Sequence, residues 1–127
     1  RHARDAGSIV IVEPLNRYET HFIRTLSQAA SLCEEVGLDE VRIMADYFHM
    51  SIEEADIGSS LKKHLGKIVH VHLADSNRLT PGRGHTDFSS LRVLKEGGYK
   101  YYLALECGIP GDPEEELRRT LSFLKSF

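Results

Sequence analysis

Four short runs of apolar and β-branched residues alternate with segments of helical periodicity, and this alternation limits the folds open to the chain. The runs occupy residues 8–13, 41–46, 67–74 and 101–107, and each has the length and composition of a buried strand. Strands that alternate with helices pair in parallel and build βαβ units. The sequence therefore predicts an α/β fold with a parallel sheet, organised as a single domain over residues 1–127.

Helices are predicted between the strands from apolar spacing and from capping residues. Four helices are expected, at residues 20–36, 51–65, 87–96 and from Asp112 or Pro113 onward. The second helix is expected to begin at Ser51, and the last to present Leu117, Leu121 and Leu124 on one face.

Four β/α units fit either a small open sheet or half of an eight-stranded β/α barrel, which usually needs ~250 residues. No GxGxxG turn follows the first strand, so the common nucleotide-binding form of the open sheet is not favoured. The polar residues at the strand ends favour the barrel. We therefore predict a (β/α)8 TIM-barrel type fold, of which this chain forms about four units, that is, half a barrel.

Each predicted strand carries an ionisable residue at or near its carboxyl end. Because these ends meet at one edge of a parallel sheet, the four side chains are expected to converge. Three carboxylates and an imidazole brought together repel one another unless a cation binds them. Three oxygen donors and one nitrogen donor without a thiolate suit Mn²⁺, Mg²⁺, Co²⁺ or a similar ion. The predicted ligands of this single divalent ion are Glu13, Asp46, His72 and Glu106.

Two further histidines lie close to these positions. His70 has the parity of His72 and is expected one layer deeper, as a core or supporting residue and not as a ligand. His49 follows Asp46 by three positions, where it can reach a bound substrate.

The segment that follows the third strand, residues 74–84, is polar and rich in glycine, as functional loops often are. Arg78 in this loop is suited to gripping hydroxyl or carboxylate oxygens. Residues 82–85, Gly-Arg-Gly-His, fit either a phosphate cradle or a plain turn, and a plain turn is favoured.

Charge and cysteine content exclude several classes of protein. A formal net charge of −3 argues against a nucleic-acid binder, which needs a basic surface. No apolar run approaches the ~18 residues of a membrane span. Cys33 and Cys107 are far apart and form no CxxC, so both are expected as reduced, mostly buried thiols in a cytoplasmic protein.

Several motifs together resemble one family. They are EPLNRYE at residues 13–19, DYFHM at 46–50, HVHLADSNR at 70–78 and the strand-end Glu106. These look like the D-tagatose 3-epimerase family, the ketose 3-epimerases of the xylose-isomerase-like barrel superfamily. The resemblance covers nearly the whole chain and corresponds to the second half of such a barrel.

The resemblance implies a metal-dependent sugar isomerase that inverts C3 of a ketose through an enediolate. Residues matching Glu13, Asp46, His72 and Glu106 bind one divalent metal in this family, commonly Mn²⁺. Those matching Glu13 and Glu106 also form the acid/base pair. The substrate, a small sugar, is contacted by the residues that match Glu19, His49 and Arg78.

Three other functions compete with epimerisation. An aldose–ketose or hydroxypyruvate-type isomerase would use the same metal and carboxylates but move the proton between C1 and C2. An endonuclease IV-like DNA repair enzyme has counterparts of the HxHxAD motif, but it needs a basic face for DNA, which the net charge disfavours. The third alternative is an inactive piece of a barrel.

Because half a barrel is not closed, we expect the sheet to have two unpaired edge strands. The chain begins at Arg1, which indicates a trimmed start or the C-terminal part of a longer protein. We expect its edges to be covered by a missing N-terminal half or by a second copy in a homo-oligomer, and no stable monomer otherwise. The exposed inner face is expected to carry Val10, Val12, Ile43 or Met44, and Leu103 or Leu105.

Overall fold

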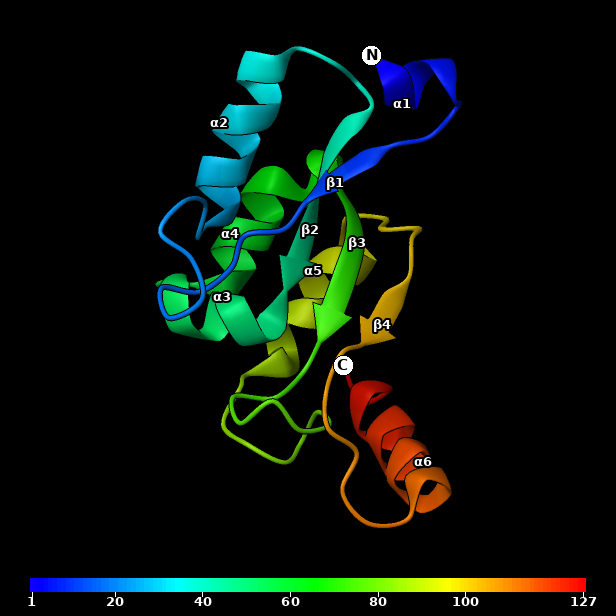
Figure 1. Cartoon of the computed structure of the whole chain (residues 1–127). Coiled ribbons are helices and arrows are strands. Elements are labelled where there is room, and N and C mark those ends of the chain that lie inside the picture. Colours follow the sequence, from blue (N-terminus) through cyan, green and yellow to red (C-terminus); the bar gives the residue numbers. More distant parts are fainter.

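The computed structural model describes residues 1–127 and is built on a four-stranded parallel sheet (Figure 1). The strands lie in the order β1-β2-β3-β4, the same as their order in the sequence. They are β1 (Val10–Val12), β2 (Val41–Asp46), β3 (Ile68–Leu73) and β4 (Leu103–Leu105). All four predicted runs contain a strand, although the two edge strands are shorter than expected. Sequential order without a reversal is what consecutive β/α units of a barrel give, whereas a doubly wound sheet reverses its order.

Each of the four predicted helical regions contains helix, but not all of the bounds match. They are α1 (His2–Asp5), α2 (Leu26–Val36), α3 (Tyr47–Glu53), α4 (Ile57–His64) and α5 (Leu91–Glu96), with α6 (Pro113–Leu124) last; two 3₁₀ turns are η1 (Leu65–Lys67) and η2 (Phe88–Ser90). Helix α2 begins later than expected because Thr25 forms a capping box with Gln28. The short helix α1 was not expected.

The predicted single helix over residues 51–65 is wrong. Two helices, α3 and α4, cover this stretch, and each has its own aspartate at the N-cap. Asp46 accepts from the backbone N–H groups of Phe48 and His49, and Asp56 accepts from that of Ser59. Ser51 therefore lies inside α3 and does not begin a helix.

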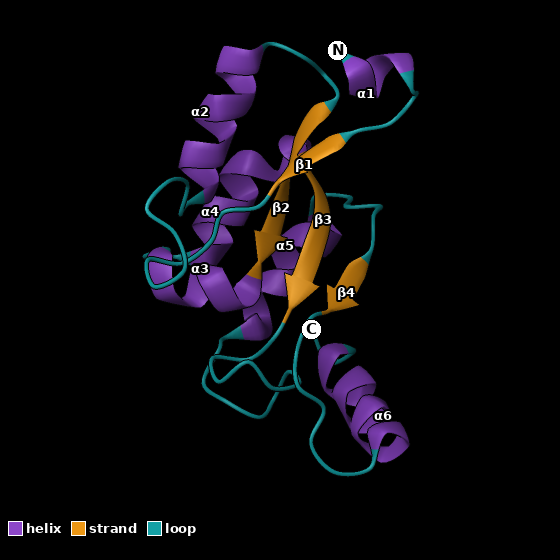
Figure 2. Ribbon diagram, viewed as in Figure 1, coloured by secondary structure: helices purple, strands orange, loops and turns teal.

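Helices α2 to α5 lie along one side of the sheet and bury its apolar face (Figure 2). The core joins residues of α2 and α4 to alternate residues of β2 and β3, including Leu26, Cys33, Ile43, Leu61 and Val71. Cys33 is buried, as expected, and Cys107 is partly buried. None of the helices is both long enough and apolar enough to cross a lipid bilayer.

The opposite face of the sheet corrects the expected inner face. Val12 pairs with the fully buried Ile43, and Leu103 with the fully buried Val71, so these side chains share the helix-covered face. Val10 and Leu105 have the same parity and belong to that face too. Of the predicted set, only Met44 belongs to the inner face.

The reason for this error is the period of two along a strand. Glu13, Asp46 and Glu106 point to the inner side, so the residues two positions earlier must share it. Those residues are Ile11, Met44 and Ala104. Together with His70 they give a mixed inner face and not an apolar one.

Helix α6 is attached in an unexpected way. It starts at the predicted Asp112–Pro113 pair, but its buried residues are Glu116 and Thr120, and Leu121 is 55% exposed. Glu116 accepts hydrogen bonds from Thr80 and from the guanidinium groups of Arg83 and Arg119, and these donors hold its pKa far below the usual range. Polar contacts therefore fasten α6 to the loop after β3, while Phe123 and Leu124 at its end pack against the core.

Candidate functional site

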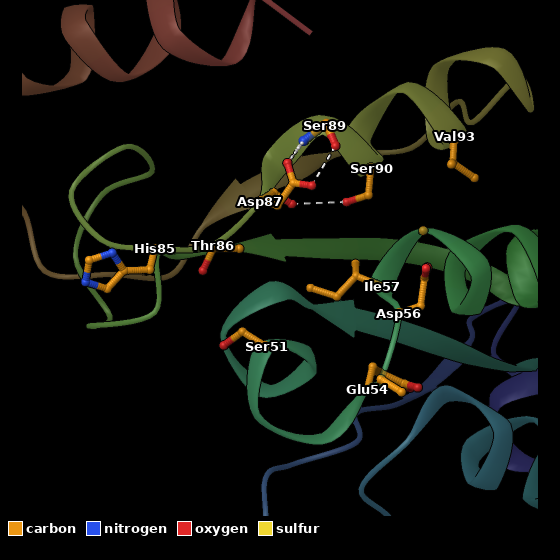
Figure 3. A pocket seen from close by; sticks show the side chains of 12 residues that line it. Ser51, Glu54, Asp56, Ile57, His85, Thr86, Asp87, Ser89, Ser90 and Val93 are labelled. Carbon is orange, nitrogen blue, oxygen red and sulfur yellow. Dashed lines mark hydrogen bonds between the residues drawn. The ribbon is translucent and has the colours of Figure 1, made fainter.

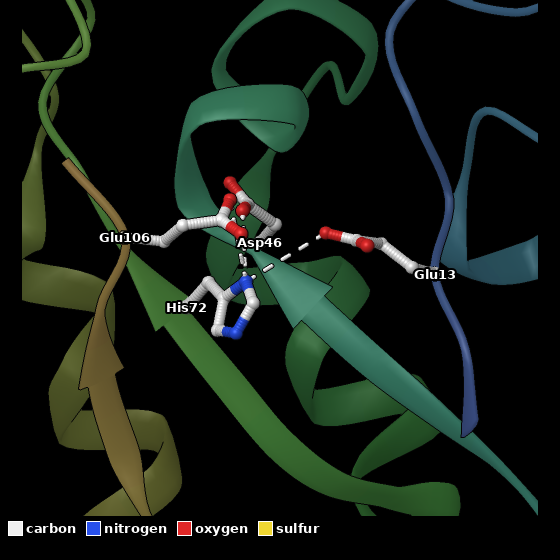
Figure 4. A group of neighbouring side chains, drawn as sticks. All are labelled: Glu13, Asp46, His72 and Glu106. Atoms are coloured by element: carbon white, nitrogen blue, oxygen red, sulfur yellow. Dashed lines mark ion pairs between the residues drawn. The ribbon is translucent and has the colours of Figure 1, made fainter. Parts of the chain in front are cut away.

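Four ionisable side chains meet at the carboxyl ends of the four strands (Figure 4). One donor atom from each lies within 4.8 Å of all the others. His72 Nδ1 is central: it lies 3.4 Å from Asp46 Oδ2, 3.5 Å from Glu106 Oε2 and 3.7 Å from Glu13 Oε1. Asp46 and His72 are paired in register on the two inner strands, while Glu13 and Glu106 follow the two edge strands. The structure thus brings together all four residues that the sequence singled out as ligands.

Asp46 is oriented by the helix that follows it. Its Oδ1 accepts from the N–H groups of Phe48, at 2.8 Å, and His49, at 3.2 Å, and so caps α3. Its other oxygen, Oδ2, is therefore turned toward His72. Because α3 begins directly after β2, Oδ1 of Asp46 is used to cap the helix, and Oδ2 is left to take part in the site.

The residues fit a divalent cation. Asp46 Oδ2 and His72 Nδ1 are both buried and have no hydrogen-bond partner. A buried polar group without a partner lowers the stability of the fold by ~1–3 kcal/mol. A cation at the centre of the cluster would bind both atoms and remove this cost. Burial raises the pKa of Glu13, and the neighbouring carboxylates of Asp46 and Glu106 raise it further, while His72 opposes them. Three oxygens and one imidazole nitrogen form a donor set for hard or borderline ions.

The three residues expected to contact substrate lie beside this cluster. Arg78 Nη1 donates to Glu19 Oε1 and Nη2 donates to Glu106 Oε2, both at 3.2 Å. Its guanidinium carbon also lies 4.7 Å from the ring centroid of Phe48. Arg78 therefore joins a candidate ligand, Glu106, to the predicted substrate contacts.

His49 is held by a residue to which the sequence reasoning gave no role. The backbone N–H of Asn16 donates to His49 Nδ1 at 3.2 Å, so this nitrogen is an acceptor. In the neutral ring the proton then belongs to Nε2, a tautomer assigned from the hydrogen bond. His49 Nε2 is buried and has no partner, which leaves it as a free donor.

Asn16 also orients Glu19. Its side chain is 1% exposed, and its Nδ2 donates to Glu19 Oε1 at 3.0 Å and lies 2.9 Å from His49 Nδ1. Its Oδ1 accepts from the N–H of Tyr18. The only sequence signal was its place within EPLNRYE.

His70 lies one layer below the cluster, as expected. Its ring meets that of His72 edge to face, with centroids 5.0 Å apart. Burial, and then the neighbouring His72, lower the pKa of His70. It supports the ring of His72 and is not one of the four convergent donors.

Two other features do not form part of the site. The N–H groups of Gly82 and Arg83 donate to the Asp75 carboxylate, so residues 82–85 are not a phosphate cradle. A separate hollow of about 560 Å³ lies between the α3–α4 connection and α5 (Figure 3). The carboxylates that line it already accept hydrogen bonds from backbone N–H groups. Those of Asp56 and Asp87 cap helical turns, and that of Glu54 accepts from the N–H of Leu26.

The chain belongs to the family described as "Xylose isomerase-like TIM barrel", whose model matches residues 1–127. It is 37% identical over 126 residues to 3-dehydro-D-guloside 4-epimerase of Escherichia coli K12, covering 98% of this chain and 48% of that protein. It is also 37% identical over 105 residues to D-psicose 3-epimerase of Agrobacterium fabrum, covering 82% and 36%.

A solved structure gives the same picture. The crystal structure of 3-keto-D-glucoside 4-epimerase from E. coli matches with a TM-score of 0.92 and 36% identity, over 98% of this chain and 48% of that one. The chain thus spans about half, or less, of the length of the relatives it matches. The barrel fold and the resemblance to sugar epimerases are confirmed.

Two aspartates provide a matched test of metal binding, because each is the N-cap of a helix. Asn is as good an N-cap as Asp, so neither substitution should disturb its helix. We expect Asp46→Asn to weaken Mn²⁺ binding by roughly 10–100-fold or more, since even outer partners of a metal site have effects of this size. Asp56→Asn should leave the affinity unchanged. Titration calorimetry on both variants makes the measurement, and equal affinities would refute the assignment.

Proposed function

We propose that the protein epimerises a sugar at the carbon next to a ketone, namely C3 of a ketose, by removing and returning a proton through an enediolate. One observation carries the proposal: Glu13 and Glu106 reach the same centre from opposite edges of the sheet (Figure 4). Inversion requires one group that takes the proton from one face and a second that delivers a proton to the other. Two strand-end carboxylates facing each other across a site supply both.

The C3 proton of a ketose is weakly acidic because the charge left behind is delocalised onto the C2 carbonyl. A divalent ion held by Glu13, Asp46, His72 and Glu106 would act there as a Lewis acid that stabilises this charge, with Mn²⁺ preferred over Mg²⁺ or Co²⁺.

The two glutamates of the proposed pair differ in environment. The Glu13 side chain is 29% exposed and that of Glu106 is 47% exposed, and burial raises the pKa of Glu13. Unequal protonation of two carboxyl groups is what a paired acid and base require. Each such group contributes ~10²–10⁴ in rate when it is well placed. Because the reaction is reversible, the two exchange roles between its directions.

The remaining polar groups would hold the sugar. The unpaired Nε2–H of His49 would donate to a substrate oxygen, and the Arg78 guanidinium offers several donors in a planar array. The Glu19 carboxylate, fixed by Asn16 and Arg78, would accept from a hydroxyl. Substrate oxygens would replace some of the contacts that these side chains now make with one another.

A second candidate is epimerisation at C4 of a 3-keto glycoside. It is favoured by the match to the E. coli 4-epimerase over 98% of this chain. The chemistry is the same but is shifted by one carbon, because the C4 proton is next to a C3 ketone.

For either reaction, we propose that residues 1–127 form part of a single barrel domain. We also propose a cytoplasmic location, in keeping with the two free cysteines.

Deuterium incorporation separates these functions. The full protein is incubated in D₂O with Mn²⁺ and either D-psicose or a 3-keto glucoside, and the products are examined by NMR. Deuterium at C3 of the ketose supports the first candidate, and deuterium at C4 of the glycoside supports the second. Deuterium only at C1 of the ketose would instead indicate an aldose–ketose isomerase.

A variant adds a check on the two-carboxylate mechanism. At saturating Mn²⁺, Glu106→Gln should abolish net inversion, yet Glu13 should still exchange the substrate proton of one epimer with solvent. Glu115→Gln, on the exposed side of α6, is the control and should behave as the unaltered protein. Full inversion by Glu106→Gln would contradict the proposed roles.

The open edges of the sheet bear on how the site is completed. β1 and β4 each pair on one side only, and Val10, Tyr102 and Leu103 are 50%, 81% and 46% exposed. We propose that these edges are covered by a further half-barrel, either a preceding segment or a second copy. Exposed edges otherwise invite aggregation.

Sedimentation of the 127-residue chain at micromolar concentration, with and without Mn²⁺, tests this expectation. The chain alone should associate, and Mn²⁺ should stabilise it because binding only to the folded form favours that form. A compact monomer with a sharp thermal transition in the absence of metal would contradict it.

A further inference from the structure

The loop that carries Arg78 is folded around a single buried carboxylate. Asp75, the second residue after β3, is 1% exposed. Its Oδ1 accepts from the N–H groups of Ser76 and Thr86 at 2.8 and 2.9 Å, and its Oδ2 from those of Gly82 and Arg83 at 2.8 and 2.9 Å. Four backbone donors thus converge on one side chain, and no basic side chain forms an ion pair with it.

The charge of Asp75 is satisfied by these donors. Burial by itself raises the pKa of Asp75, but the backbone hydrogen bonds outweigh it and leave the pKa below its ordinary value. The carboxylate therefore acts as an internal anion, in the place that a bound phosphate would take in a glycine-rich cradle.

The glycines of the loop are explained by this anion. A Cβ built on Gly84 would lie 2.5 Å from Asp75 Oδ1, closer than real Cβ atoms come to any atom. Gly82 has φ +86°, a conformation that other residues rarely adopt. The glycine-rich turn lets the backbone close on the carboxylate.

The backbone of Asp75 also sets the conformation of Arg78. The N–H of Arg78 donates to the Asp75 carbonyl at 2.8 Å, and the N–H of Asp75 donates to the Leu79 carbonyl at the same distance. Arg78 has φ +58° and is the only non-glycine residue with a positive φ. Such a conformation costs ~1–3 kcal/mol and persists only where the surroundings impose it.

A second contact fixes Arg78 from the other side. The N–H of Gly108, two residues beyond Glu106, donates to the Arg78 carbonyl at 2.8 Å. The backbone of Arg78 is thus held between the Asp75 turn and the segment that carries Glu106. From this position its guanidinium reaches Glu19 and Glu106.

We propose that Asp75 is a positioning residue for the reaction. The loop folds around the Asp75 carboxylate, which thereby holds the Arg78 guanidinium where the substrate binds. The inference rests on the proposed function, in which Arg78 contacts the sugar. The Asp75 carboxylate itself bonds only backbone N–H groups and none of the four convergent donors.

A double-mutant cycle tests the link between the two residues. Asp75→Asn keeps the shape but replaces an acceptor with a donor that faces backbone N–H groups. We expect it to raise KM by roughly tenfold, the scale of one misplaced hydrogen bond to substrate, with little change in Mn²⁺ affinity. In an Arg78→Ala background, Asp75→Asn should have almost no further effect on KM. An undiminished effect there, or an unchanged KM in the single variant, would overturn the proposal.

A control and a second variant guard against a general loss of folding. Ser76→Ala removes only the hydrogen bond from His85 N–H to Ser76 Oγ in the same loop, and its KM should stay unchanged. If Asp75→Asn does not fold, Gly84→Ala disturbs the same carboxylate without altering its charge, and the same cycle with Arg78→Ala applies.

A readout without catalysis separates this proposal from the proposed function. Hydrogen exchange at the amides of Gly82, Arg83 and Thr86 should accelerate in Asp75→Asn, and its crystal structure should show the Arg78 guanidinium away from Glu19 and Glu106. Unmoved Arg78 would overturn the positioning role. If the unaltered protein epimerises no sugar, the proposed function fails, while this measurement still decides the role of Asp75.

Discussion

Mutual repulsion among three carboxylates gathered around one imidazole is the constraint that the surrounding structure has to satisfy. Parallel strands in sequential order bring their carboxyl ends together, so Glu13, Asp46 and Glu106 cannot avoid one another once the sheet forms. The N-terminus of α3 engages one oxygen of Asp46, and Arg78 engages one of Glu106. Asp46 Oδ2 and His72 Nδ1 remain buried without partners, and a divalent cation is the partner that suits both.

Of the groups proposed to bind substrate, Glu19 and Arg78 come from loops and His49 from α3, and each is held by a buried polar residue. Asn16 fixes Glu19 and the tautomer of His49, and Asp75 fixes the loop of Arg78. Asn16 and Asp75 are each 1% exposed, and their side chains form hydrogen bonds with neighbouring polar groups. Strand ends thus position the groups of the proposed chemistry, while internal hydrogen bonds position the proposed substrate contacts.

The sequence predicted the strands, the parallel sheet and the four convergent residues because each depends on local composition and on strand ends that meet. Long-range contacts explain part of what it missed. Asn16 and His49 are separated by 33 positions, and Thr86 lies 11 positions from Asp75, so neither partnership leaves a local pattern. The two helices within residues 51–65 are separated by the cap at Asp56. The inner face was predicted wrongly although parity with Glu13 identifies Ile11. Helix α6 is attached through Glu116 to Thr80 and Arg83 of the loop after β3, besides the packing of Phe123 and Leu124 against the core.

The central claim is that one divalent ion binds where the four strands end. Crystals of the full protein grown with Mn²⁺ and measured at the manganese absorption edge test it most directly. The account predicts one anomalous peak within bonding distance of Glu13, Asp46, His72 and Glu106. A peak elsewhere, or none at the strand ends at saturating Mn²⁺, would contradict it.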